Sequence, residues 1–369
     1  MKRILFLTFF SVFGINSILQ AQEDKDAFFI KDIYDYTLDH GLCDSWLSYL
    51  SDTIGGRLAG SESADIAVEY TLAQLAKIDI VDKTWKQPCR VPKWVRGGPE
   101  LVEINYKNAA GKSKSKKLNA LALGNTIGTG EKGLTGDIIE VFNLDTLDIL
   151  GRNNIEGKVV FYNRPMDRKR INTGHAYGEA VDQRVHGASR ASKYGAKAAL
   201  VRSVTTRHDH LPHTGVQSSA ADIDPIPSLA ISTNDAEALS DLLENNSVSV
   251  YIKNDAHMMD SVVSHNVIAE IKGSEFPDEI ILVGGHLDSW DVGGGAHDDG
   301  SGCVHSMQVI ATLNALNYKP KRTIRCVLFM NEENGLGGGK AYAKASNQNG
   351  EYHLAAIESD SGGFTPRGF

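Results

Sequence analysis

The stretch that decides the fold is IILVGGHLDSWDVGGGAHDDGSG, residues 280–302. It opens with a continuous apolar run, the pattern of a strand that is covered on both faces of a parallel sheet. Two further apolar runs follow, RTIRCVLFM and LAAIES, and the segments between them predict helices over about 300–316 and 338–345. The order strand, helix, strand, helix, strand predicts an α/β domain with a mostly parallel central sheet.

Side chains of the kind that bind metals follow each of these runs: His286 after the first, Glu332 after the second and Asp360 after the third. In open α/β sheets the ligand crevice lies outside the carboxyl ends of the strands, so we expect the three to converge. Imidazole and carboxylate ligands without thiolates suit zinc, or less selectively manganese or cobalt. Asp288, two residues after His286, can accept the other ring proton and fix the tautomer.

Two acidic pairs accompany these positions. The Asp298-Asp299 pair stands beside glycine, so one carboxylate can bridge two metal ions while the other holds the loop. In the Glu332-Glu333 pair, one side chain can bind metal while the other handles a proton, since a metal brings the pKa of a bound water near neutrality. A solvated acidic surface is the alternative for any single pair. A phosphate-binding loop is excluded, because the carboxylates would repel phosphate and no GK[ST] follows.

The rest of the chain shows a change of pattern. Residues 61–78 repeat apolar side chains at helical spacing, and LVEINY predicts a strand. The middle third then gives short strands at GDIIEVF, GKVVFYN and AALVRSV, with one helix over 183–194 that ends at Gly195. This strand-rich part has the character of an insertion. The histidines of HDHLPH are interpreted as polar surface and not as a metal site.

Residues 1–21 have a positive start, an apolar run and a small-residue exit, which predicts a cleaved signal peptide and a secreted or periplasmic protein. With Lys2 and Arg3 removed, the formal net charge changes from −8 to −10, which makes nucleic acid a poor partner. The apolar run is too short to span a bilayer, so no membrane attachment is expected after cleavage. Of the four cysteines, Cys43 and Cys89 are the candidate disulfide pair.

HLDSWDVGGGAHDDGSG, RTIRCVLFMNEENG and IESDSGG resemble the M28 family of co-catalytic zinc peptidases. The resemblance extends upstream through GGRLAGS, VPKWVRG, LGNTIGT, GKVVFYN, GAKAALVRSV and PHTGVQ, and so covers nearly all of the chain after residue 21. It implies a catalytic domain formed by residues 22–118 and 257–369, interrupted by a β-rich protease-associated insertion at residues 119–256. It also implies two zinc ions per chain.

The resemblance assigns a role to each site residue. It makes His286 a ligand of one zinc, Asp298 the bridging carboxylate, Glu333 a ligand of the other zinc, Asp360 the remaining carboxylate ligand, Glu332 the general base and Asp288 the partner of His286. The Asp298-Asp299 bond corresponds to a cis peptide of the family. The family has one more histidine ligand downstream of Asp360, where this sequence has none, so we expect a chain truncated at its C-terminus.

The function implied is hydrolysis of dipeptides or short peptides through a hydroxide that bridges the metals, by an aminopeptidase, carboxypeptidase or dipeptidase. The family also suggests a homodimer. Two alternatives stay open: a single-zinc transferase similar to glutaminyl cyclases, and a non-catalytic relative that binds peptides. The sequence does not show which peptides are preferred, or whether the amino or the carboxyl terminus of the peptide is bound.

Overall fold

The computed structural model describes residues 25–365, so the predicted signal peptide lies outside the described residues. It divides into two units, residues 1–41 and 42–369. The first contributes helix α1 (Lys25–His40), which buries none of its side chains. Within residues 25–365, no helix combines the length and the apolar character needed to cross a membrane.

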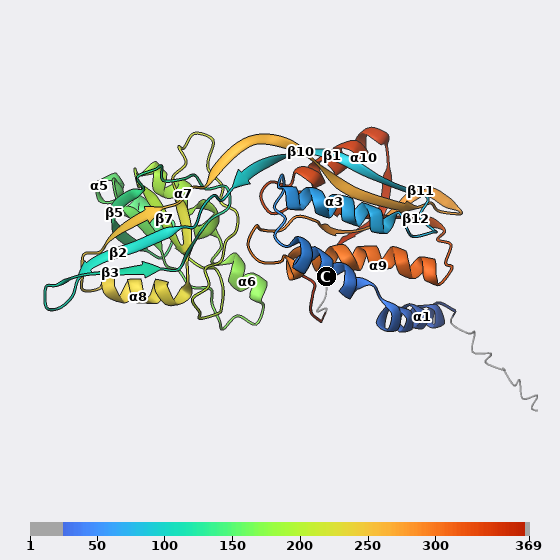
Figure 1. The fold of residues 1–369 in the computed structure, drawn as a ribbon, viewed down its shortest axis with the longest axis horizontal. Coiled ribbons are helices and arrows are strands. Elements are labelled where there is room, and N and C mark those ends of the chain that lie inside the picture. Colours follow the sequence, from blue (N-terminus) through green and yellow to red (C-terminus); the bar gives the residue numbers. More distant parts are fainter. Residues whose placement is uncertain (1–24, 366–369) are drawn as a thin grey trace, which may run out of the picture. The chain divides into compact units, whose positions relative to one another are not determined.

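The second unit contains two sheets, which Figure 1 shows as separate bodies of the ribbon. The first sheet has five strands in the order β1-β10-β12-β11-β13. Their bounds are β1 Lys83–Val95, β10 His257–Ile271, β11 Phe276–His286, β12 Arg322–Phe329 and β13 Tyr352–Glu358. Four α-helices accompany this sheet, α2 Cys43–Ser48, α3 Glu62–Leu75, α9 Ser301–Ala315 and α10 Gly337–Asn349, together with the single turns η1 Tyr49–Ile54 and η2 Ala296–Gly300.

The three apolar runs form β11, β12 and β13, which pair in parallel as predicted. The expectation of a mostly parallel sheet is wrong, however, because β1 pairs with β10 and β10 with β12 in antiparallel register. The sheet is therefore mixed. The sequence of β10 begins with polar and exposed residues and shows no clear alternation, which is why its pairing was not foreseen.

Helices cover both faces of this sheet. One core joins α3 and α9 to the face that carries Val267 and Leu328. A second core joins Tyr342 of α10 to the opposite face, where Ile268 and Val327 point. Successive side chains of a strand point to opposite faces, so adjacent residues of β10 and of β12 supply the two cores. The helix predicted at residues 61–78 is α3, and the side chain of Ser61 accepts the hydrogen bond of Ala64 N–H at its start.

The second sheet has eight strands in the order β3-β2-β9-β5-β6-β7-β8-β4. The bounds are β2 Leu101–Lys107, β3 Ser113–Leu118, β4 Ala120–Ala122, β5 Leu134–Val141, β6 Val159–Tyr162, β7 Ala198–Arg202, β8 Ser228–Ile231 and β9 Ser249–Lys253. Its helices are α4 Asp145–Leu150, α5 Arg152–Ile155, α6 Thr173–Gly178, α7 Asp182–Lys193 and α8 Thr233–Leu243. Strands β5 to β8 pair in parallel.

This body differs from the strand-rich insertion that we expected. Helix α8 packs Ala236 and Leu239 on one face of the sheet, and α7 packs Ala188 and Ala191 on the other. The body is thus α/β, and the helices were underestimated because several span only four to six residues. Strand pairing also places residues 101–118 in this sheet, together with the segment that we expected to begin at residue 119.

All four cysteines are free thiols in this structure, so the candidate pair Cys43 and Cys89 is not bonded. Cys303 of α9 and Cys326 of β12 are buried in the core between α3, α9 and one face of the sheet. Burial raises the pKa of Cys326 to about 12, as expected of a thiol that serves as a small apolar side chain.

Candidate metal centre

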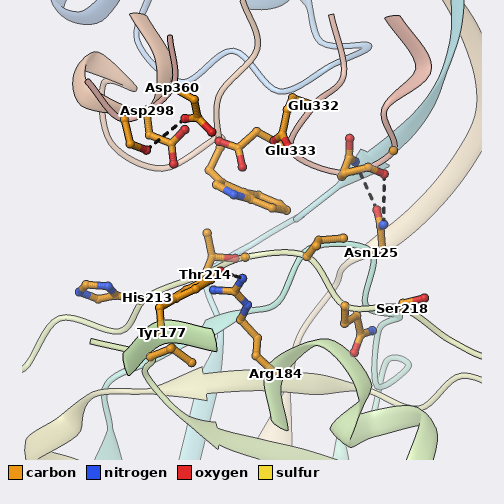
Figure 2. A pocket seen from close by; sticks show the side chains of 18 of the residues that line it. Asn125, Tyr177, Arg184, His213, Thr214, Ser218, Asp298, Glu332, Glu333 and Asp360 are labelled. Carbon is orange, nitrogen blue, oxygen red and sulfur yellow. Dashed lines mark hydrogen bonds between the residues drawn. The ribbon is translucent and has the colours of Figure 1, made fainter. Parts of the chain in front are cut away.

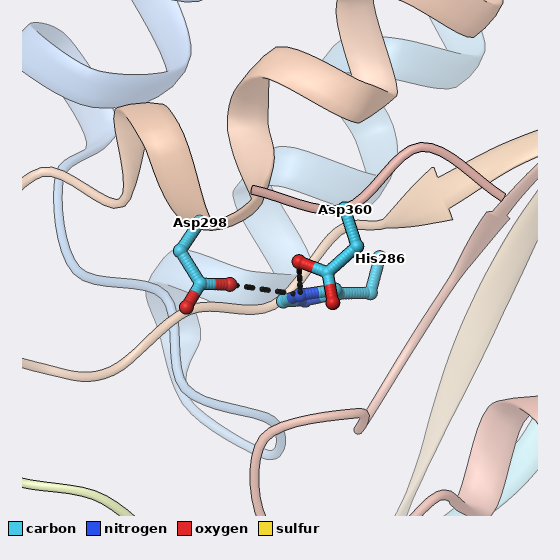
Figure 3. Close-up of side chains that lie close together, drawn as sticks. All are labelled: His286, Asp298 and Asp360. Carbon is cyan, nitrogen blue, oxygen red and sulfur yellow. Dashed lines mark hydrogen bonds and ion pairs between the residues drawn. The ribbon is translucent and has the colours of Figure 1, made fainter. Parts of the chain in front are cut away.

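The centre begins at His286, the last residue of β11, whose side chain is fully buried. Its Nδ1 donates a hydrogen bond to the backbone carbonyl of Asp288 at 3.0 Å. When His286 loses its second proton, this bond selects the tautomer in which Nε2 carries the lone pair that a metal would bind. Nε2 lies 3.0 Å from Asp298 Oδ1 and 3.6 Å from Asp360 Oδ1 (Figure 3). One atom from each of these three side chains falls within 4.8 Å of the others, a donor set suited to a divalent cation.

Asp299 holds the loop, as predicted for one member of the acidic pair, while the bridging role of Asp298 stays a prediction. The peptide bond between them is cis. Asp299 is buried, and its two oxygens accept the backbone N–H groups of His286 at 3.0 Å and Gly302 at 2.9 Å. Asp298 is about half exposed and faces the histidine. Gly302 is required here, because a Cβ at this position would lie 1.9 Å from the carbonyl oxygen of Ser359.

Asp360 reaches the centre through sheet pairing. Strand β13 runs parallel to β11, with Glu358 opposite Gly284, and Ser359 N–H donates to the carbonyl of Gly284 at 2.9 Å. Asp360 follows directly and is thereby held beside the end of β11. The interaction with His286 at 3.6 Å lowers the pKa of Asp360, although its partial burial opposes the shift.

Asp288 acts differently from our expectation. Its carboxylate lies 4.0 Å from Nδ1 of His286, and its backbone carbonyl makes the contact with the ring. The carboxylate instead accepts the backbone N–H groups of Glu332 at 2.9 Å and Glu333 at 3.3 Å. A single fully buried carboxylate therefore connects the loop after β11 with the loop after β12. Sequence spacing could not show this, because it depends on how the two loops meet.

Glu332 and Glu333 line the same cavity as Asp298 and Asp360, but they lie outside the close group of three ligand atoms. Burial raises the pKa of Glu332, and burial together with the charges of Asp298 and Asp288 raises the pKa of Glu333 to about 8. Burial alone would lower the pKa of His286, yet its hydrogen bond with Asp298 and the nearby carboxylate of Asp360 raise it to about 12. The carboxyl groups that surround the imidazole of His286 create a negative electrostatic potential, which favours the binding of a multiply charged cation.

Arg57 supports the loop and was missed at the sequence level, although it lies in the quoted motif GGRLAGS. Its side chain is fully buried. The guanidinium donates to the carbonyls of Leu287 at 2.6 Å, Gly294 at 2.9 Å and Gly295 at 2.8 Å. It therefore fixes the loop between His286 and Asp298, the two candidate ligands that flank it. The glycines on both sides of Arg57 were the available signal.

A cavity of about 1030 Å³ opens beside the candidate ligands (Figure 2). Asp298, Asp360 and the Glu332-Glu333 pair line one wall. Residues carried by the eight-stranded body line the other wall: Tyr177, Arg184, Val204, His213, Thr214, Gln217 and Ser218. The HDHLPH segment, interpreted as surface, thus contributes His213 to the cavity.

Two contacts join the walls. Asn334 Nδ2 donates to Asn125 Oδ1 at 3.2 Å, and Asn125 Nδ2 donates to the carbonyl of Asn334 at 3.4 Å. Trp290 packs so tightly over Gly124 that a Cβ there would lie 1.9 Å from the indole ring. Both contacts bring the segment LGNTIGT against the loops that carry the ligands. A site made by two separate parts of the chain is invisible to local sequence patterns.

Comparisons with known proteins agree with this geometry. Residues 266–369 match the model of peptidase family M28. The crystal structure of a peptidase M28 precursor from Shewanella amazonensis SB2B superposes with a TM-score of 0.84 at 34% identity, over 91% of this chain and 74% of that one. The chain belongs to peptidase family M28. Within M28, carboxypeptidase Q from Bos taurus is 36% identical over 323 residues, which are 87% of this chain and 65% of that protein.

Carboxypeptidase Q from Homo sapiens gives the same identity and coverage, so the chain spans 65% of the length of these M28 relatives. A zinc aminopeptidase from Bacillus subtilis shares the fold, with a TM-score of 0.60 at 21% identity. The M28 model covers the segment with all six predicted site residues, which are His286, Asp288, Asp298, Glu332, Glu333 and Asp360.

Proposed function

We propose that this chain is the catalytic part of a zinc metallopeptidase that hydrolyses dipeptides or short peptides. The observation that carries the proposal is the meeting of His286, Asp298 and Asp360, whose ligand atoms lie within 4.8 Å of one another at the ends of parallel strands. The zinc aminopeptidase of similar fold and the carboxypeptidase Q relatives support it. We further propose that residues 1–21 direct export, to the periplasm or to the exterior.

The side chains fit zinc by their chemistry. His286 is oriented through Nδ1, which leaves Nε2 directed at two carboxylates, as in zinc sites where a carbonyl fixes the ligand histidine. The group of His286, Asp298 and Asp360 contains no thiolate. The thiol of Cys303 donates a hydrogen bond to the carbonyl of His286. We propose that His286, Asp298 and Asp360 hold one zinc ion, and that Asp298 and Glu333 contribute to a second. Bound zinc supplies Lewis acidity toward a carbonyl oxygen and makes water acidic.

Glu332 is the proposed proton carrier. Its carboxyl lines the cavity, and burial raises its pKa above the ordinary value, as suits a group that accepts and returns a proton near neutral pH. Its backbone is fixed by the bond to the Asp288 carboxylate. In the proposed reaction, Glu332 accepts a proton from the attacking water and delivers it to the nitrogen of the departing amine.

The test measures zinc content after dialysis and hydrolysis of Ala-Leu by release of amino acids, for the parent chain and for Glu332→Gln. We expect the variant to keep its zinc and thermal stability while its kcat falls by about 10² to 10⁴, the size of a general acid-base contribution. Glu275→Gln, at an exposed ion pair with Lys321, is the control and should retain full activity. Normal turnover by Glu332→Gln, or no hydrolysis by the zinc-loaded parent, contradicts the proposal. One zinc per chain with cyclisation of N-terminal glutamine would indicate the transferase instead.

A further inference from the structure

The cavity has an uneven distribution of charge. Four carboxylates lie on the wall that carries the candidate ligands. Among the described residues that line the cavity, Arg184 is the only lysine or arginine, and it lies on the opposite wall, on helix α7 (Figure 2). A ligand that bridges the cavity therefore meets acidic groups at one side and a guanidinium at the other.

The guanidinium of Arg184 is held in place. Its Nη2 donates to the hydroxyl of Tyr177 at 2.5 Å, and its Cζ lies 5.5 Å from the centre of the Tyr177 ring. On the other side it packs on Gly215, where a Cβ would lie 2.3 Å from Cζ. Glycine is therefore required at 215 for the arginine to occupy this position. A side chain fixed in this way loses little further freedom when it binds a ligand.

Arg184 lacks a charged partner. No carboxylate among residues 25–365 lies within ion-pair distance of it, whereas Arg190, on the same helix, pairs with Asp148. Its Nε is buried without a hydrogen-bond acceptor. Partly buried guanidinium groups are normally paired, and their planar donors match a carboxylate in a bidentate arrangement. The position thus has the properties of an anion receptor.

The neighbouring residues are compatible with this role. His213 lines the same wall, and burial lowers its pKa, with Arg184 adding to the effect against the opposing charge of Asp209. Neutral His213 can donate one hydrogen bond to a carboxylate without contributing a second charge. Thr214 also lines this wall, with its hydroxyl donating to the carbonyl of Ala122.

We propose that Arg184 binds the free C-terminal carboxylate of the peptide substrate. This rests on the proposed function and deepens it, because it names the terminus that the site anchors. A short peptide is a zwitterion, so its carboxylate would meet Arg184 while its amine and scissile carbonyl face the acidic wall. A cavity of about 1030 Å³ accommodates a ligand of this class, since small-molecule sites span about 300 to 1,000 Å³. Peptides with a blocked C-terminus are predicted to be poor substrates.

The experiment compares Ala-Leu with Ala-Leu amide for the parent chain, Arg184→Gln and the control Arg190→Gln. Dissociation constants are measured by calorimetry on chelator-treated protein, and kcat/KM on zinc-loaded protein. We expect the parent to favour the free acid by about 10- to 100-fold, the effect of a hydrogen bond to a charged group. Arg184→Gln should lose this preference, mainly because the KM for the free acid rises. Its dissociation constant and kcat/KM for the amide should stay within about twofold of the parent values. Arg190→Gln should retain it.

Equal binding of acid and amide by the parent chain overturns the proposal, as does an equal loss for both ligands in Arg184→Gln. Arg184→Lys should restore only part of the preference, because an ammonium group does not reproduce the planar pair of donors. The binding arm separates the two proposals. If the chelator-treated chain binds Ala-Leu more tightly than its amide but the zinc-loaded chain hydrolyses neither, the proposed peptidase activity is refuted and the proposed role of Arg184 in binding a carboxylate is sustained.

Discussion

The side-chain carboxylate of Asp288 accepts a hydrogen bond of 2.9 Å from the backbone N–H of Glu332. The bond fixes the loop after β12 to the loop after β11, and with it the distance between the proposed proton carrier Glu332 and the candidate ligand His286. Asp288 is fully buried, and burial raises the pKa of its carboxyl while the bonds from the Glu332 and Glu333 N–H groups oppose the shift. An acidic side chain that is buried at such a cost has a structural task at the centre.

Replacement of Asp288 is predicted to weaken metal binding. In Asp288→Asn one of the two oxygens becomes an NH2 group, which donates and cannot accept, so only one of the Glu332 and Glu333 N–H groups keeps its acceptor and the loop is held less firmly. Zinc affinity should fall by about 10- to 100-fold, the usual effect of losing a residue that orients metal ligands. Competition with a zinc chelator measures it. Asp291→Asn, on the same loop but paired with Arg96, is the control, and equal affinities for all three proteins would contradict the prediction.

The stabilisation by zinc should increase with pH. Burial raises the pKa of Glu333 to about 8 and that of Asp299 to about 7. Since unfolded carboxyls titrate near pH 4, the folded metal-free chain binds more protons than the unfolded chain between about pH 4 and 8, and its stability falls as pH rises. The raised pKa of His286, about 12, acts in the same direction above about pH 6.5. Zinc displaces these protons and removes the penalty.

Thermal unfolding with and without zinc at pH 5.5, 7 and 8.5 tests this dependence. The increase in melting temperature caused by zinc should be largest at pH 8.5 and smallest at pH 5.5. In Asp298→Asn, which loses a charged candidate ligand, the zinc effect should shrink at every pH. If zinc raised the melting temperature of the parent chain equally at all three pH values, the metal would not be displacing protons from these carboxyl groups.

Asp235 should stabilise the eight-stranded body. It is buried at the start of α8, and its carboxylate accepts from Asn119 N–H at 2.8 Å, from the Asn119 side chain at 2.7 Å and from Ser232 at 3.0 Å. Burial opposes ionisation, but these bonds and Lys116 lower its pKa. Because the folded pKa is depressed, the contribution is fully present above about pH 3.9 and is lost as pH falls through the folded value.

Asp235→Asn is therefore predicted to lower the free energy of unfolding by about 1 to 3 kcal/mol at pH 7. Urea denaturation at pH 7 and at acidic pH measures the free energy of unfolding of the variant and the parent. The difference between the two should become smaller as Asp235 of the parent becomes protonated. Asp241→Asn, at an exposed position on the same helix, should change stability by less than about 0.5 kcal/mol. A loss at Asp241 as large as that at Asp235 would refute the account.

Gly124 is predicted to tolerate no side chain. Because its Cβ would lie 1.9 Å from Trp290, Gly124→Ala must displace the indole, at a cost of about 1 to 3 kcal/mol in unfolding free energy. Peptide hydrolysis should fall as well, since Trp290 lines the cavity, while zinc content stays unchanged. Gly339→Ala, in helix α10 with open space around it, should instead stabilise the chain by about 0.4 to 1 kcal/mol. Equal stability of Gly124→Ala and the parent would contradict the packing argument.

Local sequence patterns predicted the ligand wall well. Apolar runs give strands, and the carboxyl ends of parallel strands meet at one edge, so chain order predicted that His286, Glu332 and Asp360 converge. His286 and Asp360 do meet, whereas the third member of the close group is Asp298, and Glu332 lines the cavity beside it. The helix beginning at Ser61 was equally predictable, because its cap and its apolar spacing are local features. The role of Glu333 as a ligand stays a prediction, since it lines the cavity outside the close group.

The features that local sequence patterns did not predict depend on contacts between segments that are distant along the chain. The antiparallel pairing of β10 with β1 joins strands more than 160 residues apart, as in the register of Lys83 with Glu270. The opposite wall of the cavity, with Arg184 and Tyr177, belongs to a body whose position beside the ligands no local pattern reveals. Helix α8 was missed although Ser232 caps it, because its polar residues masked the spacing of its apolar ones.

The two walls of the cavity have separate origins along the chain. Residues that would carry out bond cleavage come from the five-stranded sheet, and those that would choose the peptide come from the eight-stranded one. Selectivity and reactivity can therefore change independently. Exchange of α7 and its neighbouring loops between homologues offers a way to redirect such an enzyme toward new peptides while its reaction chemistry stays intact.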